Sequence, residues 1–293
     1  AGVLPKRSAP PPPAAATDGG ADSGESSLSP AAILGDDSTA AALYAKLQRD
    51  GIVHIDDFGL GGARLDAIGA RFEQMQRDGA APAEPRGAEQ ISSVSGGDVV
   101  TARMELPTLE ALLTNASIVR VLQSYLGGAV TLDGYKVTKL ATREAADVAA
   151  YVAARWHHDR AGRRIKMFLF LHDIDCEQGH PTRVAAGTHN VLYYRTEEFP
   201  HTRFTDEYVE AQYDVQLGCG KRGGGFIFDT HTVHKGTPEG SAERTTVIVE
   251  AHNSLKCPAV RAMGLPIPCP SGDQHRLHRL LEPQPQPPRS CSA

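Results

Sequence analysis

Arg155-Trp156-His157-His158-Asp159 is the stretch that says most about the fold and chemistry of this chain. We expect it to end a strand that runs over residues 151–157. Side chains two residues apart on a strand share a face, so His157 and Asp159 point together while His158 points away. One imidazole and one carboxylate on one face form two corners of the facial triad that suits iron(II) and leaves coordination positions open.

The third corner should come from a strand far along the sequence, and His234 fits. It follows the short apolar segment 226–228, and Arg244 opens another apolar strand ten residues later. Alternation puts Arg244 and Thr246 on one face of that strand and Val247 on the other. A guanidinium facing inward binds a carboxylate through two parallel hydrogen bonds, as the distal carboxylate of 2-oxoglutarate requires.

Other histidines compete for these roles. His231 lies in the same segment as His234 and is the alternative distal ligand, although it stands thirteen residues before Arg244. His158 is expected to turn toward neighbouring polar groups rather than the metal. Read alone, His157 and Asp159 also fit a surface histidine and a turn aspartate. The later His234 and Arg244, in that order, favour the metal site.

Helical patterns come first along the chain and strand patterns come afterwards. Apolar residues at helical spacing predict helices over residues 40–49, 63–77, 108–113 and 118–126. Residues 80–100, rich in Gly, Ala and Pro, predict a long loop. Strands are expected at 52–55, 131–138, 165–171, around Val184, and at 211–217, 226–228 and 244–251. The order indicates a mainly β fold with flanking helices packed on an antiparallel sandwich.

At these motifs the chain resembles the phytanoyl-CoA dioxygenase-like family. Trp156-His157-His158-Asp159 is similar to the family's WHxD, and Leu171–Gly179 looks like the strand and turn that follow it. Ala186-Gly187-Thr188-His189 looks like its PGSH segment, with Ala186 in place of Pro. The resemblance covers roughly residues 37–252. It implies a double-stranded β-helix (a jelly-roll, cupin-like core), Fe(II) on His157, Asp159 and His234, 2-oxoglutarate as co-substrate, and O2.

Some positions depart from the family pattern. Gly236 stands where a serine that helps to bind 2-oxoglutarate is expected, so Thr246 or Thr237 is predicted to take over that contact. The gap from His234 to Arg244 is shorter than in the family, so the hairpin between them is expected to differ. The early strand offers Lys136, with Lys139 and Tyr135 as alternatives, as a further contact to the co-substrate. Asp159 is retained, which favours oxygenation over halogenation.

Composition excludes some functions and leaves others open. The 293 residues carry a net charge of -5 and a pI near 6.2, so there is no broad basic field and nucleic acid is a poor partner. No stretch approaches the roughly 18 to 20 apolar residues of a transmembrane helix, so we expect a soluble protein. Five cysteines without CxxC spacing argue against a zinc knuckle or a dense disulfide framework. Cys257 and Cys269 can pair or remain thiols; the compartment and oligomeric state stay open.

The two ends of the chain differ from its middle. Residues 1–36 are rich in Pro, Ala, Gly and Ser, which predicts disorder. One dioxygenase domain is expected over 37–258, followed by a partly disordered extension over 259–293. The chain begins at Ala1 rather than Met, so we expect any targeting signal to lie outside it.

The predicted activity is hydroxylation of a small organic or acyl substrate, with release of succinate and CO2. Residues 80–100, 142–154 and 192–210 are candidates for covering the pocket. The rival functions are a non-catalytic metal-binding jelly-roll protein and a cupin-type metal enzyme that does not use 2-oxoglutarate.

Overall fold

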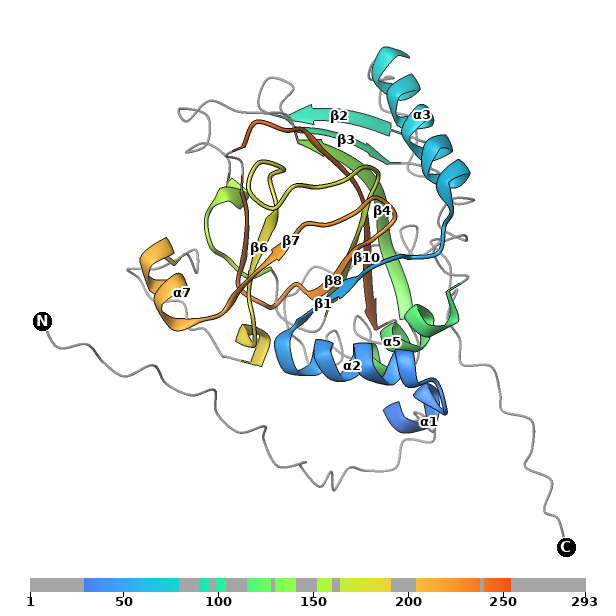
Figure 1. Ribbon diagram of the computed structural model, residues 1–293, viewed down its shortest axis with the longest axis vertical. Helices are drawn as coiled ribbons and strands as arrows, with labels where there is room; N and C mark the ends of the chain where they lie inside the picture. Colours follow the sequence, from blue (N-terminus) through green and yellow to red (C-terminus); the bar gives the residue numbers. More distant parts are fainter. Residues whose placement is uncertain are drawn as a thin grey trace, which may run out of the picture.

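The computed structural model describes residues 29–78, 90–94, 99–103, 115–127, 130–140, 152–159, 164–190, 204–237 and 240–253. In these parts of the chain two antiparallel sheets lie against helices (Figure 1). The described helices include none long and apolar enough to cross a membrane.

The larger sheet has seven strands in the order β1-β8-β5-β10-β4-β3-β2. Their bounds are β1 Ile52–Ile55, β2 Gln90–Val94, β3 Val99–Arg103, β4 Val130–Leu140, β5 Arg164–Phe170, β8 Gly225–Asp229 and β10 Arg244–Asn253. The smaller sheet has the order β7-β6-β9, with bounds β6 Thr182–Ala185, β7 Val215–Gly218 and β9 His234–Gly236. The strands β2, β3 and β4 follow one another in both chain and sheet, as do β6 and β7, but the other connections cross between non-adjacent strands or between the sheets, as in a jelly roll.

Five α-helices are described, with bounds α1 Pro30–Leu34, α2 Ser38–Asp50, α3 Gly62–Asp78, α5 Ala116–Leu126 and α7 Asp206–Gln212. Asp37 caps the start of α2 by accepting a hydrogen bond from the Ala40 amide at 2.9 Å. Gly51 ends α2 in the left-handed conformation, with φ 72°, and the chain passes directly into β1. The helices expected at 40–49, 63–77 and 118–126 are confirmed; the one expected at 108–113 lies outside the described residues.

Alternation along the strands separates two cores. Side chains on the outer face of the larger sheet, such as Met167, Val247 and Val249, pack with apolar residues of α2, α3 and α5. Side chains on the opposite face form a second cluster between the sheets: Ile52, Phe168, Phe170, Ile174, Val184, Phe226, Phe228 and Ile248. The predicted fold class, mainly β with a jelly-roll core and flanking helices, is confirmed. The inner cluster defines the interior into which a site can be built.

Three local predictions were wrong. Residues 80–100 are not all loop, because β2 and β3 pair across 90–103, where Val and Ile favour strand over the neighbouring glycines. Residues 151–157 are not a strand: Val152–Ala154 form a 3-10 turn, since Ala153 and Ala154 have little strand preference. Residues 211–217 begin in α7, which is started by the Thr205 cap and two acidic residues in its first turn.

The glycine-rich segment 218–225 carries the chain from β7 in the smaller sheet to β8 in the larger one. At the N-terminal end, α1 lies within the stretch 1–36 that was expected to be disordered, and its Leu34 is buried in the outer core. Residues 1–28 lie outside the described part, as do Cys257 and Cys269, so their predicted properties stay predictions.

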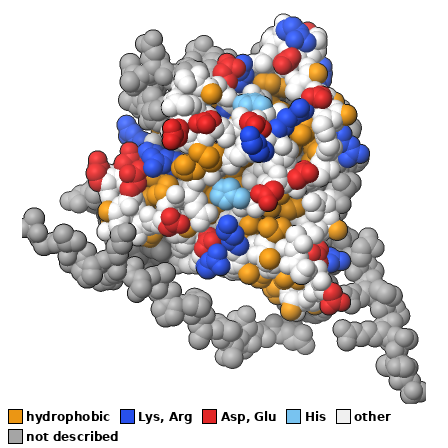
Figure 2. All heavy atoms as spheres, in the orientation of Figure 1, with side chains coloured by type: hydrophobic (Ala, Val, Ile, Leu, Met, Phe, Trp, Pro, Cys, Tyr) orange, Lys and Arg blue, Asp and Glu red, His pale blue; other side chains and the backbone are white. Residues whose placement is uncertain are grey.

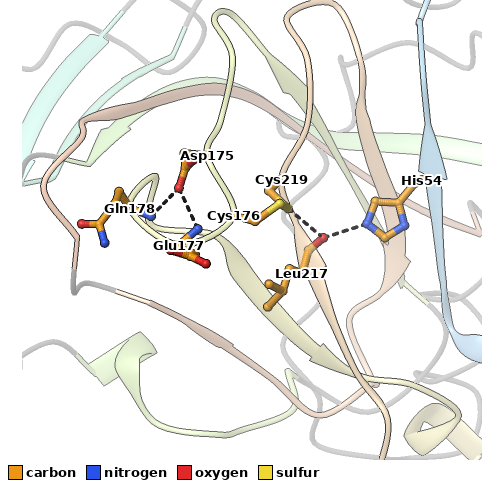
Figure 3. Close-up of a disulfide and its surroundings, with 7 residues drawn as sticks. All are labelled: His54, Asp175, Cys176, Glu177, Gln178, Leu217 and Cys219. Carbon is orange, nitrogen blue, oxygen red and sulfur yellow. Dashed lines mark hydrogen bonds between the residues drawn. A yellow bond between two sulfur atoms is a disulfide. The ribbon is translucent and has the colours of Figure 1, made fainter.

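A disulfide that the sequence did not suggest joins Cys176 and Cys219, 43 residues apart. Figure 3 shows that it connects the turn after β5 to the segment after β7. The turn is held by Asp175, whose Oδ1 accepts hydrogen bonds from the amides of Glu177 and Gln178 at 2.8 and 2.7 Å. The disulfide therefore ties the two sheets together at one end of the interior.

Candidate metal centre

His157, Asp159 and His234 come together as a group that can hold a metal ion. Each offers one ligand atom, and these atoms lie within 4.8 Å of one another. The backbone brings them together: the His157 amide donates to the His234 carbonyl at 3.0 Å, and the His234 amide donates to the His157 carbonyl at 2.7 Å. This isolated bridge positions His157, which the sequence had predicted to lie at the end of a strand.

The two imidazoles are held in one tautomer. Nδ1 of His157 lies 2.7 Å from the carbonyl oxygen of Arg155, and Nδ1 of His234 lies 2.7 Å from that of Thr232. A carbonyl only accepts, so Nδ1 of each ring carries a proton and Nε2 is the nitrogen left to face a metal ion. These Nε2 atoms lie 3.8 Å (His157) and 3.9 Å (His234) from Oδ1 of Asp159. Three donor atoms thus face a common point.

Asp159 is held from both its backbone and its side chain. Its amide donates to the Thr230 carbonyl at 2.9 Å, and its Oδ2 accepts from Nζ of Lys166 at 2.6 Å. Burial works to raise the pKa of the Asp159 carboxyl, but the charge of the Lys166 ammonium and its hydrogen bond to Oδ2 act against burial, and the pKa is lowered to about 2. The carboxylate is therefore ionised at neutral pH.

His234 is held neutral. Its burial, with the nearby His157, lowers the pKa of the imidazole to about 3, against the opposing attraction of Asp159. An ionised carboxylate and neutral imidazoles are the protonation states in which these groups bind a metal. Metal–nitrogen and metal–oxygen bonds of about 2.1 Å bridge donors up to about 4.2 Å apart, so the described positions fit one ion after small movements.

His158 and His231 pair with each other outside this group. Their ring centroids lie 4.9 Å apart, and Nδ1 of His158 lies 2.7 Å from the Asp159 carbonyl oxygen. The His231 amide donates to Oδ1 of Asp229 at 2.8 Å. The structure therefore places His158 where alternation predicted it, and it places the alternative ligand His231 against His158.

Arg244 and Thr246 lie on the interior face of β10, as the alternation predicted. Arg244 is buried, and its Nη1 donates to the His180 carbonyl at 2.6 Å and to Oγ1 of Thr182 at 3.1 Å. Thr246 is fully buried opposite Phe170, and its Oγ1 has no hydrogen-bond partner among the described residues. The Arg244 guanidinium and the Thr246 hydroxyl, which has no hydrogen-bond partner among the described residues, thus lie on the same face of β10.

The position of Arg244 relative to the candidate ligands follows from strand register. Thr182, which its guanidinium touches, lies on β6 two residues before Val184, and Val184 stands opposite His234 on β9. Two residues of a strand span about 7 Å. The guanidinium therefore contacts β6 two residues along the strand from the position opposite His234.

Lys136, the other predicted co-substrate contact, lies in an ion network. Its Nζ is 3.6 Å from Oε1 of Glu250, while Arg164 binds Oε2 of the same carboxylate. On the face shown in Figure 2, acidic and basic side chains are likewise interspersed. These contacts place Lys136 on β4 beside Glu250 of β10.

Two contributors were not identified from the sequence. Lys166 contacts Asp159. The sequence does mark this residue, because Lys166 is the charged residue that interrupts the apolar run 165–171. His180, whose carbonyl accepts from Arg244, has a positive φ of 52°. No sequence pattern marks a residue that acts through its carbonyl.

Comparisons with known proteins bear on the fold. Neither protein-family models nor curated proteins match the sequence. Among solved structures, the chain is similar to the epimerase SnoN in complex with Fe3+, alpha ketoglutarate and nogalamycin RO (TM-score 0.55, 16% identity, covering 75% of this chain and 85% of that one).

Two further structures are similar over most of their length. AviO1 from Streptomyces viridochromogenes Tue57 has a TM-score of 0.51 at 19% identity, over 73% of this chain and 95% of that one. HygX from Streptomyces hygroscopicus, with nickel and 2-oxoglutarate bound, has a TM-score of 0.51 at 8% identity, over 73% and 87%. At these identities the likeness shows a shared fold, one that SnoN and HygX use to bind a metal and 2-oxoglutarate.

Proposed function

We propose that the protein is an iron(II)- and 2-oxoglutarate-dependent dioxygenase that hydroxylates a small organic or acyl molecule. The observation that carries this proposal is the arrangement of His157, Asp159 and His234. Two Nε2 atoms face one carboxylate oxygen, and a buried arginine lies on the interior face of β10. Two imidazoles and one carboxylate suit iron(II) and leave positions open for other ligands.

The chain's own residues have distinct parts in this proposal. His157, Asp159 and His234 would hold the iron, which would supply dioxygen activation while 2-oxoglutarate supplies two electrons and leaves as succinate and CO2. Arg244 binds the distal carboxylate of the co-substrate through its guanidinium. Thr246 offers its buried hydroxyl to the same carboxylate, and Oγ1 of Thr237 is likewise buried without a partner among the described residues.

The apolar interior supports the same function. Phe168, Phe226 and Phe228 are buried between the sheets, and the Phe228 ring meets the His234 ring edge-on with centroids 4.9 Å apart. Such walls exclude water, which strengthens the hold of Arg244 on a carboxylate and limits side reactions. That SnoN and HygX bind alpha ketoglutarate or 2-oxoglutarate on this fold adds support by analogy.

The test measures co-substrate binding and turnover. Metal-free protein is loaded with Ni(II) and titrated with 2-oxoglutarate by calorimetry, and Fe(II)-loaded protein is assayed for succinate release. We expect both signals in the wild type and neither in Asp159→Ala protein. Asp173→Ala is the matched control, because Asp173 pairs with Lys221 at 2.7 Å on the surface. Metal-loaded wild-type protein that binds no 2-oxoglutarate would contradict the proposal.

A further inference from the structure

We infer that Lys166 is a positioning residue for the proposed metal site, since its ammonium keeps Oδ2 of Asp159 away from the metal so that the carboxylate binds through Oδ1 alone. This inference rests on the proposed function. Its basis is that the two oxygens of the Asp159 carboxylate have different partners. Oδ1 faces the Nε2 atoms of His157 and His234, while Oδ2 lies 2.6 Å from Nζ of Lys166.

The position of Lys166 in the sheet explains why its side chain reaches Asp159. On β5 it alternates with Ile165 and Met167, which pack in the outer core, so it lies on the interior face with Phe168. Its side chain is only 19% exposed. A lysine at such a position is costly unless its charge is paired.

A competing partner lies directly across the strand. Lys166 stands opposite Glu250 of β10, the nearest carboxylate by register. Both oxygens of Glu250 are already engaged, however, by Lys136 on Oε1 and by Arg164 on Oε2. The network around Glu250 therefore leaves the Lys166 ammonium for Asp159.

The consequence concerns the number of open coordination positions. A carboxylate can bind a metal through one oxygen or through both. If Asp159 used both, it would occupy a position that a chelating 2-oxoglutarate needs. The charge-assisted hydrogen bond from Lys166 occupies Oδ2 of Asp159. The ammonium and the metal ion are both positive and repel each other, so Oδ2 stays on the side away from the metal. Lys166 thereby keeps the metal open on the side where the co-substrate binds.

The chain offers a matched control. Lys235 on β9 is buried and also makes an ion pair, with its Nζ 2.5 Å from Oδ1 of the exposed Asp206. It is the residue next to His234, but it faces Trp156, with Nζ 5.4 Å from the ring centroid. Lys235→Met therefore removes the same kind of interaction beside a candidate ligand without touching Asp159.

The experiment loads metal-free protein with Mn(II) and counts the metal-bound waters by water-proton relaxation, then titrates 2-oxoglutarate. In Lys166→Met we expect at least one water fewer on Mn(II) and an affinity for 2-oxoglutarate at least about tenfold weaker, because the co-substrate must first displace Oδ2 of Asp159 from the metal. The affinity for Mn(II) itself should stay within about threefold, because all three ligands remain. Lys166→Arg should restore both values, and Lys235→Met should match the wild type.

Some outcomes overturn the inference. A wild-type number of waters with wild-type affinity for 2-oxoglutarate in Lys166→Met would do so, as would an equal change in Lys235→Met. If Lys166→Met does not fold, Lys166→Gln, which removes the charge and keeps a polar side chain, is measured against the same expectations. Failure of the wild type to bind Mn(II) at all would instead remove the proposed metal site, so the two failures are distinguishable.

Discussion

Arg244 donates a 2.6 Å hydrogen bond to the carbonyl oxygen of His180, a residue whose backbone is in the left-handed region with φ 52°. Among the described residues, His180 is the non-glycine residue recorded with a positive φ. Such a conformation costs about 1 to 2 kcal/mol in a non-glycine residue, and it persists where surrounding contacts fix it. The His180 ring makes one such contact, since its Nδ1 lies 3.1 Å from the carbonyl oxygen of Thr237.

Arg244→Lys is expected to weaken the binding of 2-oxoglutarate to metal-loaded protein by about 10- to 100-fold, because an ammonium cannot make two parallel hydrogen bonds to a carboxylate. Calorimetry with Ni(II)-loaded protein measures the change. Arg222→Lys is the control, since Arg222 pairs with Asp66 at the surface. Equal affinities in Arg244→Lys and wild-type protein would remove Arg244 from the co-substrate site.

Substitution of each candidate distal ligand separates His234 from His231. His234→Ala should abolish tight metal binding, because Nε2 of His234 faces Asp159. His231→Ala should retain it within about tenfold, since His231 packs on His158 and acts only through neighbouring contacts. Equilibrium dialysis with Co(II) measures both affinities. The reverse order of effects would make His231 the ligand.

Tyr125→Phe is expected to lower the free energy of unfolding by about 1 to 3 kcal/mol, because it leaves a buried carboxylate oxygen without its donor. Tyr125 on α5 donates to Oδ2 of Asp229 at 2.7 Å, and Oδ1 of Asp229 accepts from the His231 amide. Urea unfolding measures the loss. Tyr44→Phe, which removes a half-buried hydroxyl that bonds Gln48 on α2, should cost about 0.5 kcal/mol. Equal losses would mean that the Asp229 contact has no special weight.

Reduction of the Cys176–Cys219 disulfide should destabilise the protein by up to about 4 kcal/mol, the loop-closure value for a separation of this size. Urea unfolding with and without dithiothreitol measures the difference. The double variant Cys176→Ser and Cys219→Ser should resemble the reduced protein and should no longer respond to dithiothreitol. A response that persists in the double variant would point to another disulfide, such as one between Cys257 and Cys269.

The metal-free protein should lose stability as the pH falls. The pKa of His234 is about 3 in the folded protein and about 6.5 in the unfolded chain, so between these values only the unfolded chain binds the proton. His234 therefore lowers the free energy of unfolding by at most about 1.4 kcal/mol for each pH unit below 6.5. Asp159, with a folded pKa of about 2, adds to the loss only below about pH 3.9.

Urea unfolding in the presence of a chelator at pH 7 and pH 5 tests this prediction. His234→Gln should show a smaller difference between the two pH values than the wild type, because glutamine does not titrate. An unchanged difference would mean that His234 is protonated in the folded, metal-free state.

The sequence by itself determined the elements whose patterns are local. The helices over 40–49 and 63–77 follow from apolar spacing, and β10 follows from a run of β-branched residues over 245–249. Alternation also put Arg244 and Thr246 on one face, because the period of a strand is fixed by its backbone. The pairing of His157 with Asp159 was predicted too, although the expected strand at 151–157 is a 3-10 turn.

Only the tertiary structure decided how distant segments meet. The grouping of His234 with His157 and Asp159 comes from an isolated bridge between the two histidines. The Lys166–Asp159 contact forms where Glu250 is already paired with other cations. The disulfide joins cysteines 43 residues apart, and the His180 carbonyl acts through its backbone. Periodicity describes which face a side chain takes; it says nothing about which other segment covers that face, because register between distant segments is set by packing.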